Sequence, residues 1–290
     1  MLIPANIAYL NGRYAPLPEL QVSVMDRGFL FGDGVYELVP VYDRRPFRLV
    51  EHLRRMGKSM AAVALVDPYS LAQWEQIVGQ VSASQDFADQ SIYLQVTRGP
   101  AWPRSHAFPT DIHPTIFVYA EPLLPPAPAL ILNGVMAVTA NDIRWGRCNI
   151  KACSLMANVL LKQMAVEAGA DEVILLRDGG LIEGGSSNVF IVRDGLILAP
   201  PPSERMLTGI TYDVVQELAQ AHRLPLVLRE ISEAEFRTAD EVWITSSSKE
   251  ILAVVELDGR PIGNGVPGPI YRRMNDFYQA FKTATMRPSR

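Results

Sequence analysis

Residues 147–161 read RCNIKACSLMANVLL, and they place one lysine, Lys151, just ahead of a run of small, apolar and amide side chains. An ammonium group is costly in apolar surroundings, so this position calls for an explanation. In the simplest one, the stem of Lys151 lies along a hydrophobic core while its amine reaches water. In the other, the amine takes part in chemistry, and the rest of the sequence separates the two.

The composition is that of an ordinary soluble globular protein. The chain has 290 residues, 48% of them hydrophobic and 20% charged, which is enough for two domains of usual size. A formal charge of −4 gives no basic field for a nucleic-acid backbone. Cys148 and Cys153 are spaced neither as metal ligands nor as a disulfide framework, so we expect reduced thiols, no metal and a cytoplasmic location. Neither a signal peptide nor an apolar run of about 20 residues is present, so we expect no membrane partner.

The first half of the chain has the pattern of a sheet with one long helix. Asn11-Gly12 suits a tight hairpin turn. Residues 35–49 are rich in β-formers and are broken at Asp43 to Pro46, while residues 51–65 repeat apolar side chains at helical spacing. Residues 91–99 and 115–121 are predicted to pair as strands of the same sheet.

A proline-rich stretch separates the two halves. Four prolines between Pro122 and Pro128 indicate a stiff extended connector. We therefore predict a small N-terminal α/β domain at 1–120, a linker at 121–129, and a larger C-terminal domain with Lys151 at 130–290. In the second half we predict strands at 135–140, 172–177, 188–200 and 241–247, and helices at 152–169, 209–222 and 271–282. The fold class is α+β.

Two stretches of the second half could bind charged groups of a ligand. LTGITYDVV, from Leu207, places a glycine before a helix and Thr211 in its first turn, an arrangement that suits an anion but also an ordinary helix start. EGGSSNVFIV begins with Glu183, which could face a cationic group, although polar surface turns also look like this.

Two further stretches could add contacts. The serines of EVWITSSSKE, including Ser247, end a predicted strand and could donate to an anion, but a lone serine run means little. TRGPAWPRSHAFP carries Arg104 and His106, which could hold a carboxylate or simply form a solvated basic loop.

Together these stretches suit one ligand, pyridoxal 5'-phosphate. Its aldehyde forms a Schiff base with a lysine, its phosphate binds N–H and hydroxyl donors, and a carboxylate opposite its ring nitrogen keeps that nitrogen protonated. Partial desolvation favours the neutral, nucleophilic form of an amine. The apolar setting of Lys151 is thereby explained as a hypothesis.

The same stretches, in the same order, resemble the fold-type IV pyridoxal-phosphate enzymes, and among them the D-amino acid transaminases. The resemblance covers nearly the whole chain. It rests on DRGFLFGDGVYE at 26–37, EHLRR at 51–55, VTRG and PRSHAFP between 96 and 109, DIRWGRCNIK ending at Lys151, EGGSSNVF from Glu183, LTGIT from Leu207 and ITSSSKE from Ile244.

The resemblance implies two domains with the cofactor site between them, a homodimer, and a ping-pong transfer of an amino group between D-alanine, D-glutamate or D-aspartate and 2-oxo acids. It implies that Lys151 holds the cofactor as an aldimine and moves the substrate proton, and that Glu183 pairs with the ring nitrogen. The implied cofactor contacts are Arg55, Ser186, Leu207, Ile210, Thr211 and Ser247. The implied substrate-carboxylate contacts are Tyr36, Arg104 and His106. Gly185 stands where the resemblance leads us to expect a serine, so one hydroxyl contact is in doubt.

Two alternatives stay open. One is another enzyme of the same fold, a branched-chain L-amino acid transaminase or an aminodeoxychorismate-type lyase, which shares Lys151 and Glu183 but not the Arg104 and His106 pair. The other is a binding or scaffold protein without catalysis, in which Lys151 only lies along the core.

Overall fold

The computed structural model describes residues 3–111 and 113–286. Contacts between Cα atoms divide the chain into two compact units, one of Met1–Leu124 with Ile150–Leu155 and one of Pro125–Asn149 with Met156–Arg290. The segment Ile150–Leu155, which carries Lys151, is thus grouped with the first unit and not with its neighbours in sequence. The domain limits given above stay a prediction.

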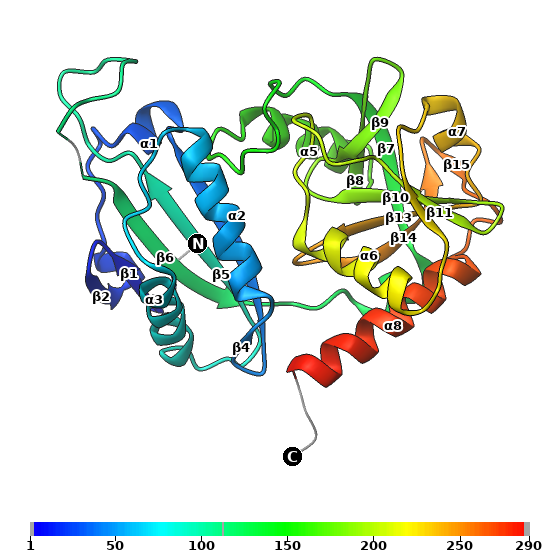
Figure 1. Cartoon of the computed structure of the whole chain (residues 1–290), viewed down its shortest axis with the longest axis horizontal. Coiled ribbons are helices and arrows are strands. Elements are labelled where there is room, and N and C mark those ends of the chain that lie inside the picture. Colours follow the sequence, from blue (N-terminus) through cyan, green and yellow to red (C-terminus); the bar gives the residue numbers. More distant parts are fainter. Residues whose placement is uncertain (1–2, 112, 287–290) are drawn as a thin grey trace. The chain divides into compact units, whose positions relative to one another are not determined.

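The first unit is built on a six-stranded sheet in the order β2-β1-β6-β5-β3-β4 (Figure 1). Its strands are β1 (Ile7–Leu10), β2 (Arg13–Pro16), β3 (Gly34–Tyr42), β4 (Arg45–Pro46), β5 (Gln90–Thr97) and β6 (Thr115–Pro122). Its helices are the 3₁₀ turn η1 (Leu17–Glu19), α1 (Arg27–Phe31), α2 (Leu49–Ala62) and α3 (Leu71–Ala83).

Local sequence explains the strands of this sheet. Asn11 and Gly12 both have positive φ, 48° and 92°, and join β1 to β2 as the hairpin pattern predicts. β5 and β6 pair antiparallel from Gln90–Pro122 to Thr97–Thr115, which confirms the predicted pairing of those two strands. Strand structure does not continue beyond Pro46, because α2 already begins at Leu49, and in this respect the prediction for residues 35–49 is wrong.

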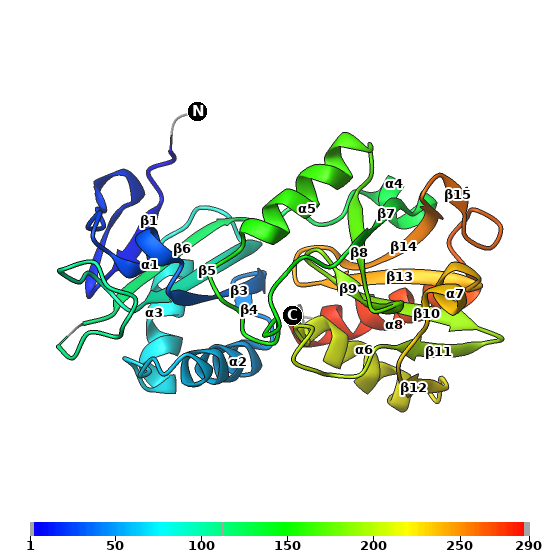
Figure 2. The ribbon, with the colours of Figure 1, turned by 90° about the horizontal axis from the view of Figure 1, so that it is seen from above.

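Helices α2 and α3 lie on the same face of the sheet (Figure 2). Met56 and Met60 of α2 are almost fully buried against the strands, as their spacing predicts, and so is Trp74 of α3. The sequence analysis did not predict α3, although Ser70 and Gln73 form a capping box at its start. This core fixes the face of α2 that carries the functional side chains described below.

The second unit is built on a nine-stranded sheet in the order β12-β11-β10-β13-β14-β7-β8-β9, with β15 paired to β14. Its strands are β7 (Val135–Asn141), β8 (Glu172–Arg177), β9 (Gly180–Gly184), β10 (Asn188–Arg193), β11 (Leu196–Ala199), β12 (Leu226–Leu228), β13 (Glu241–Ser246), β14 (Glu250–Leu257) and β15 (Arg260–Pro261). Its helices are α4 (Pro128–Asn133), α5 (Met156–Glu167), α6 (Ile210–Ala221), α7 (Glu233–Arg237) and α8 (Pro269–Met286). Helices α6 and α8 pack on each other and on β13, whereas α5 packs on β7 and β8.

Two predicted elements of this half differ from the structure. The helix expected from Ala152 begins only at Met156, because Ala152 forms a β-bridge with Val35 and the Cys153 N–H donates to the Gly34 carbonyl. The stretch 121–129 is not extended throughout, since β6 ends at Pro122 and α4 begins at Pro128, where proline suits the first helical position. Among the described residues, no helix is both long and apolar enough to span a bilayer.

Candidate active site

Backbone hydrogen bonds hold Lys151 against β3 and α2. Its carbonyl accepts from the Tyr36 N–H at 2.9 Å, and its own N–H donates to the Ser59 hydroxyl at 3.1 Å. The Lys151 Nζ lies 4.3 Å from the centroid of the Tyr36 ring. A half-buried amine is thus presented at a fixed position over an aromatic face.

Helix α2 presents His52, Arg55 and Ser59 at intervals of three and four residues, so they share one face. This face meets Glu37, which is fully buried on β3. The Arg55 guanidinium donates through Nε and Nη2 to the two Glu37 oxygens at 2.9 and 2.6 Å, and His52 Nδ1 lies 3.1 Å from Oε1. Burial alone would raise the pKa of Glu37, but Arg55 and His52 outweigh it and hold that pKa well below its usual range.

Arg104 and His106 lie in an exposed loop of the same unit. Both contact the Phe31 ring: the Arg104 guanidinium carbon is 4.5 Å from its centroid and the His106 ring is 5.2 Å away. Among the described residues, no hydrogen bond or ring contact joins either side chain to Tyr36, which stacks on Tyr93 instead. The structure therefore brings Arg104 and His106 together on Phe31, and brings Tyr36 to Lys151.

In the second unit, Glu183 near the end of β9 is almost fully buried. Arg144 Nη1 donates to Oε1 at 2.6 Å, Asn188 Nδ2 to Oε2 at 3.2 Å, and the Leu207 N–H to Oε2 at 3.1 Å. Arg144 is itself held by Asp142 through Nε and Nη2. Burial raises the pKa of Glu183 to about 7 even though the Arg144 and Leu207 donors favour the carboxylate.

The start of α6 offers donors for an anion. Gly209 precedes the helix and provides no side chain to cap the N–H groups of its first turn, which include those of Ile210 and Thr211. Asn188 positions this turn, because its Oδ1 accepts from the Gly209 N–H at 2.9 Å while its Nδ2 donates to the Leu207 carbonyl. A Cβ at Gly209 would lie 2.5 Å from that Oδ1, so the close approach requires glycine.

The buried hydroxyl of Thr245 is a second indication that a polar ligand binds near α6. Thr245 lies opposite Asn188 in the pairing of β10 with β13. Its hydroxyl is buried and has no hydrogen-bond partner among the described residues. Buried hydroxyls are almost always paired, so an oxygen-rich anion beside α6 would satisfy this one.

The serines predicted to contact the cofactor differ in exposure. Ser186 is exposed and Ser247 is half-buried, and among the described residues neither makes a side-chain hydrogen bond. Gly185, which replaces an expected serine, could not carry one in this backbone, since a Cβ there would lie 2.7 Å from Val173 Cγ1.

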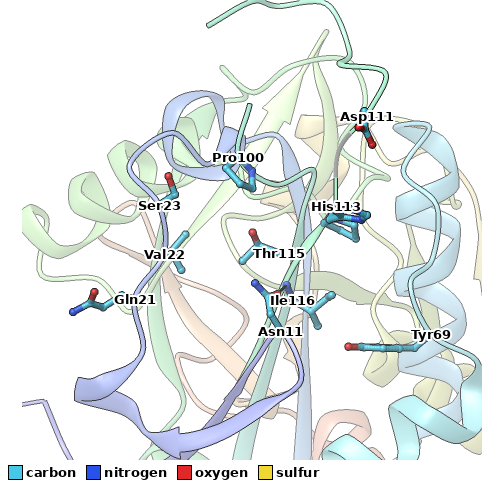
Figure 3. Close-up of a pocket in the computed structure, with 11 residues that line it drawn as sticks. Asn11, Gln21, Val22, Ser23, Tyr69, Pro100, Asp111, His113, Thr115 and Ile116 are labelled. Carbon is cyan, nitrogen blue, oxygen red and sulfur yellow. Dashed lines mark hydrogen bonds between the residues drawn. The ribbon is translucent and has the colours of Figure 1, made fainter. Parts of the chain in front are cut away.

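A cavity of about 500 Å³ lies in the first unit, lined by Asn11, Ser23, Tyr69, His113 and Thr115 among others (Figure 3). None of the predicted site residues lines it. We therefore base the candidate site on the charged clusters around Lys151 and Glu183 and not on this cavity.

The model of the amino-transferase class IV family matches residues 34–257, which include Tyr36, Lys151, Glu183 and the start of α6. The chain belongs to the class IV aminotransferases. This confirms the predicted family, the α+β fold of fold type IV and the enzyme class. It also confirms pyridoxal 5'-phosphate as the cofactor, which class IV aminotransferases use.

This aminotransferase has relatives that are similar over nearly its full length. The D-alanine aminotransferase of Bacillus licheniformis is 39% identical over 269 residues, covering 93% of this chain and 94% of its own. That of Staphylococcus aureus (strain MW2) is 36% identical over 274 residues, covering 94% and 96%. Among solved structures, a T.th. branched-chain amino acid aminotransferase with pyridoxamine 5'-phosphate has a TM-score of 0.90 at 27% identity, covering 99% of this chain and 97% of its own.

Chemically, the residues of this aminotransferase fit the cofactor. Glu183 offers a buried carboxylate for a ring nitrogen, and the start of α6 with the unpaired Thr245 hydroxyl offers donors for a phosphate. Lys151 offers the amine. Sequence reasoning missed the residues that hold these groups: Glu37 and Ser59 in the first unit, and Asp142, Arg144 and Asn188 in the second. Asp142 and Arg144 lie within DIRWGRCNIK, so their opposite charges two residues apart were the available signal.

Replacing Glu183 by Gln is expected to flatten the pH dependence of stability of the cofactor-free protein. The folded pKa of about 7 lies above the ordinary value of 4.5, so between these values the folded state holds more protons than the unfolded state. The free energy of unfolding therefore falls as the pH rises through this window, by on the order of 3 kcal/mol from Glu183. Urea unfolding at about pH 5 and about pH 7.5 measures the difference.

Glu75→Gln, at an exposed position of α3, is the control and should leave the slope unchanged. Equal slopes for the wild-type protein and Glu183→Gln would contradict the raised pKa.

Proposed function

We propose that this aminotransferase transfers the amino group of D-amino acids, D-alanine foremost, to 2-oxo acids in two half-reactions. The observation that carries the proposal is the 39% identity to a D-alanine aminotransferase over nearly the whole of both chains. D-glutamate and D-aspartate, with their 2-oxo acids, are the expected partners in the exchange.

In this proposal Lys151 is the catalytic acid and base. Bound pyridoxal 5'-phosphate supplies an aldehyde for the amine and an electron sink for the substrate carbanion. The Lys151 Nζ takes the proton from the substrate Cα and returns it in a later step. The two hydrogen bonds of the Lys151 backbone, with Tyr36 and Ser59, fix the point from which the amine reaches the substrate.

Glu183 would hold the cofactor by accepting a hydrogen bond from its protonated ring nitrogen. Arg144, Asn188 and the Leu207 N–H orient the carboxylate from the other side. By keeping a proton on that nitrogen, Glu183 would favour the transfer of the Cα proton to Lys151.

The remaining cofactor contacts that we propose surround the phosphate and the ring. The backbone N–H groups of Ile210 and Thr211 would donate from the start of α6, and Ser186 and Ser247 would add hydroxyls. Arg55, whose guanidinium is held by Glu37, would add N–H donors, and Leu207 would pack against the ring.

The substrate carboxylate is proposed to bind Tyr36, Arg104 and His106. The Arg104 guanidinium and the His106 imidazole both contact the Phe31 ring, and the guanidinium offers a charged, planar set of N–H donors for a carboxylate. An amine without a carboxylate would gain nothing from this arrangement, so the pair favours amino acids as substrates.

A branched-chain L-amino acid transaminase is the second candidate. It is favoured by the TM-score of 0.90 to the T.th. branched-chain enzyme, but the identity to that chain is 27% against 39% for the D-alanine enzyme. The handedness of the accepted substrate separates the two.

The purified holoenzyme is expected to lose its visible cofactor absorption in favour of a shorter-wavelength band when D-alanine is added. L-alanine and L-leucine should leave the spectrum unchanged, because only the D-substrate presents its Cα–H to Lys151. Absorption spectra before and after each addition measure this. A response to L-leucine alone would establish the branched-chain function instead.

Arg104→Ala is expected to raise KM for D-alanine about 10- to 100-fold with kcat nearly unchanged, because a charge-assisted hydrogen bond contributes about 1.5–3 kcal/mol in substrate and transition state alike. Steady-state kinetics measure both constants. Arg13→Ala removes a guanidinium that is 65% exposed in its pair with Glu19, and it should leave KM unchanged. An unchanged KM in Arg104→Ala would refute the carboxylate assignment.

We further propose that the protein is a cytoplasmic homodimer. Both cysteines are free thiols, which suits a reducing compartment. Helix α5 exposes an apolar stripe of Met156, Val159, Leu160, Met164 and Val166, of which Leu160 is 56% exposed. A contiguous apolar surface of this kind is typical of subunit contacts.

Leu160→Glu is expected to shift the protein from dimer to monomer, because a carboxylate in the stripe would be buried without a partner. Light scattering coupled to size-exclusion chromatography measures the mass. Val66→Glu, at an isolated valine that is 82% exposed, is the matched control and should remain dimeric. A dimeric Leu160→Glu protein would exclude α5 from the contact.

A further inference from the structure

We infer that Arg27 is the positioning residue for the loop that binds the substrate carboxylate, defined as residues 103–109. This inference rests on the proposed binding of the carboxylate by Arg104 and His106. Neither the family resemblance nor the charges of the loop itself assigns a role to Arg27.

The Arg27 guanidinium binds three successive carbonyls of the loop. Nη1 donates to the Ser105 carbonyl at 2.6 Å and to the Ala107 carbonyl at 3.3 Å, and Nη2 donates to the His106 carbonyl at 3.2 Å. A single planar guanidinium therefore fixes the backbone of residues 105–107. These residues include His106 and directly follow Arg104.

The Arg27 side chain is itself held by Asp33. It is only 4% exposed, and its Nε donates to Asp33 Oδ2 at 2.7 Å. Asp33 is shared with Arg98, whose Nη1 and Nη2 bind the Ala64 and Val63 carbonyls at 3.0 and 2.7 Å. The loop is thus connected through Arg27 and Asp33 to the end of α2, which lies in the core of the unit.

The charge of this cluster matches the role. Two guanidinium groups share one carboxylate, so the cluster carries a net positive charge that the carbonyl oxygens solvate. Phe31 connects it to the loop side chains, because Arg27, Arg104 and His106 all contact its ring. An incoming carboxylate would therefore meet a surface that is positive and already ordered.

The neighbouring Asp26 anchors the segment beyond the loop. Its carboxylate accepts from the Thr115 hydroxyl at 2.6 Å, and the Arg27 N–H donates to the Gly99 carbonyl at 3.0 Å. Asp26 thus binds Thr115, which follows the loop, and the Arg27 N–H binds Gly99, which precedes it. The Arg27 side chain binds the loop between these two anchors. Loss of the Arg27 side chain would free the carbonyls of residues 105–107, while Phe108 would keep its contact with the Arg98 guanidinium at 3.7 Å and the two ends would keep their anchors.

The test uses the holoenzyme with Arg27→Met, Arg27→Lys, Arg104→Ala and the double variant Arg27→Met with Arg104→Ala. Arg44→Met is the matched control, because Arg44 also binds two carbonyls, those of Ser82 and Gln85, in a part of the unit without site residues. KM and kcat for D-alanine are measured for each. Trypsin cleavage after Arg104 is timed for the proteins that retain this residue.

Arg27→Met is expected to raise KM about tenfold or more while kcat stays within about twofold, since carboxylate binding is equal in ground and transition states. Arg27→Lys keeps the charge but not the fork, so its KM should lie between those of the wild-type protein and Arg27→Met. The double variant should raise KM by less than the product of the two single effects, because Arg27→Met acts partly through Arg104 and partly through His106. Trypsin should cleave Arg27→Met faster after Arg104, and Arg44→Met should match the wild-type protein in every measurement.

Two results would overturn the inference while the proposed function stands: an unchanged KM in Arg27→Met and Arg27→Lys when Arg104→Ala raises it, or fully additive effects in the double variant. An unchanged KM in Arg104→Ala would instead overturn the carboxylate assignment, and the role of Arg27 in substrate binding with it. If Arg27→Met does not fold, KM and the trypsin rate of Arg27→Lys decide.

Discussion

The pairing of residues 151–153 with the start of β3 is the constraint on which the candidate site depends. The Lys151 carbonyl accepts from the Tyr36 N–H, Ala152 bridges Val35, and the Cys153 N–H donates to the Gly34 carbonyl. These bonds hold the segment extended, although its sequence would also suit a helix. The lysine is consequently held by the backbone of a sheet, which is more rigid than a loop and leaves only the side chain to move.

Two of the charged groups that we assign to the site are each held by a second charge: Arg55 by Glu37, and Glu183 by Arg144. The Ser105–Ala107 backbone is held by Arg27, which is paired in turn with Asp33. Burying such pairs is costly, and apolar residues of similar size could stabilise the fold as well or better. Their value is in orientation, because a group with several fixed partners meets its ligand without further loss of freedom.

Many of the strands, several helices and the family could be predicted from sequence, because they depend on local patterns, whereas α3 and the eight-residue strand β14 were not predicted. The Asn11-Gly12 turn, the β5–β6 pair and α6 follow from positive-φ residues and apolar periodicity. The start of α5 could not be predicted in this way, because a pairing with residues more than 110 positions away determines it. The roles of Glu37, Arg144 and Arg27 were hidden because Arg55, Glu183 and Ser105, to which they respectively bind, lie 18, 39 and 78 positions away. A charged residue also looks alike in sequence whether it is solvated or buried.

The position of Ile150–Leu155 also bears on how the protein is made. These six residues belong to the first unit, although the rest of that unit ends at Leu124. Residues 125–149, which lie between them in sequence, belong to the second unit. During synthesis the N-terminal sheet can form early, but its edge contacts with Lys151, Ala152 and Cys153 must wait until residue 155 has left the ribosome. Lys151 is therefore set in place only after the second unit has begun to appear, so a chain that ends before residue 150 would carry the sheet and α2 without this lysine.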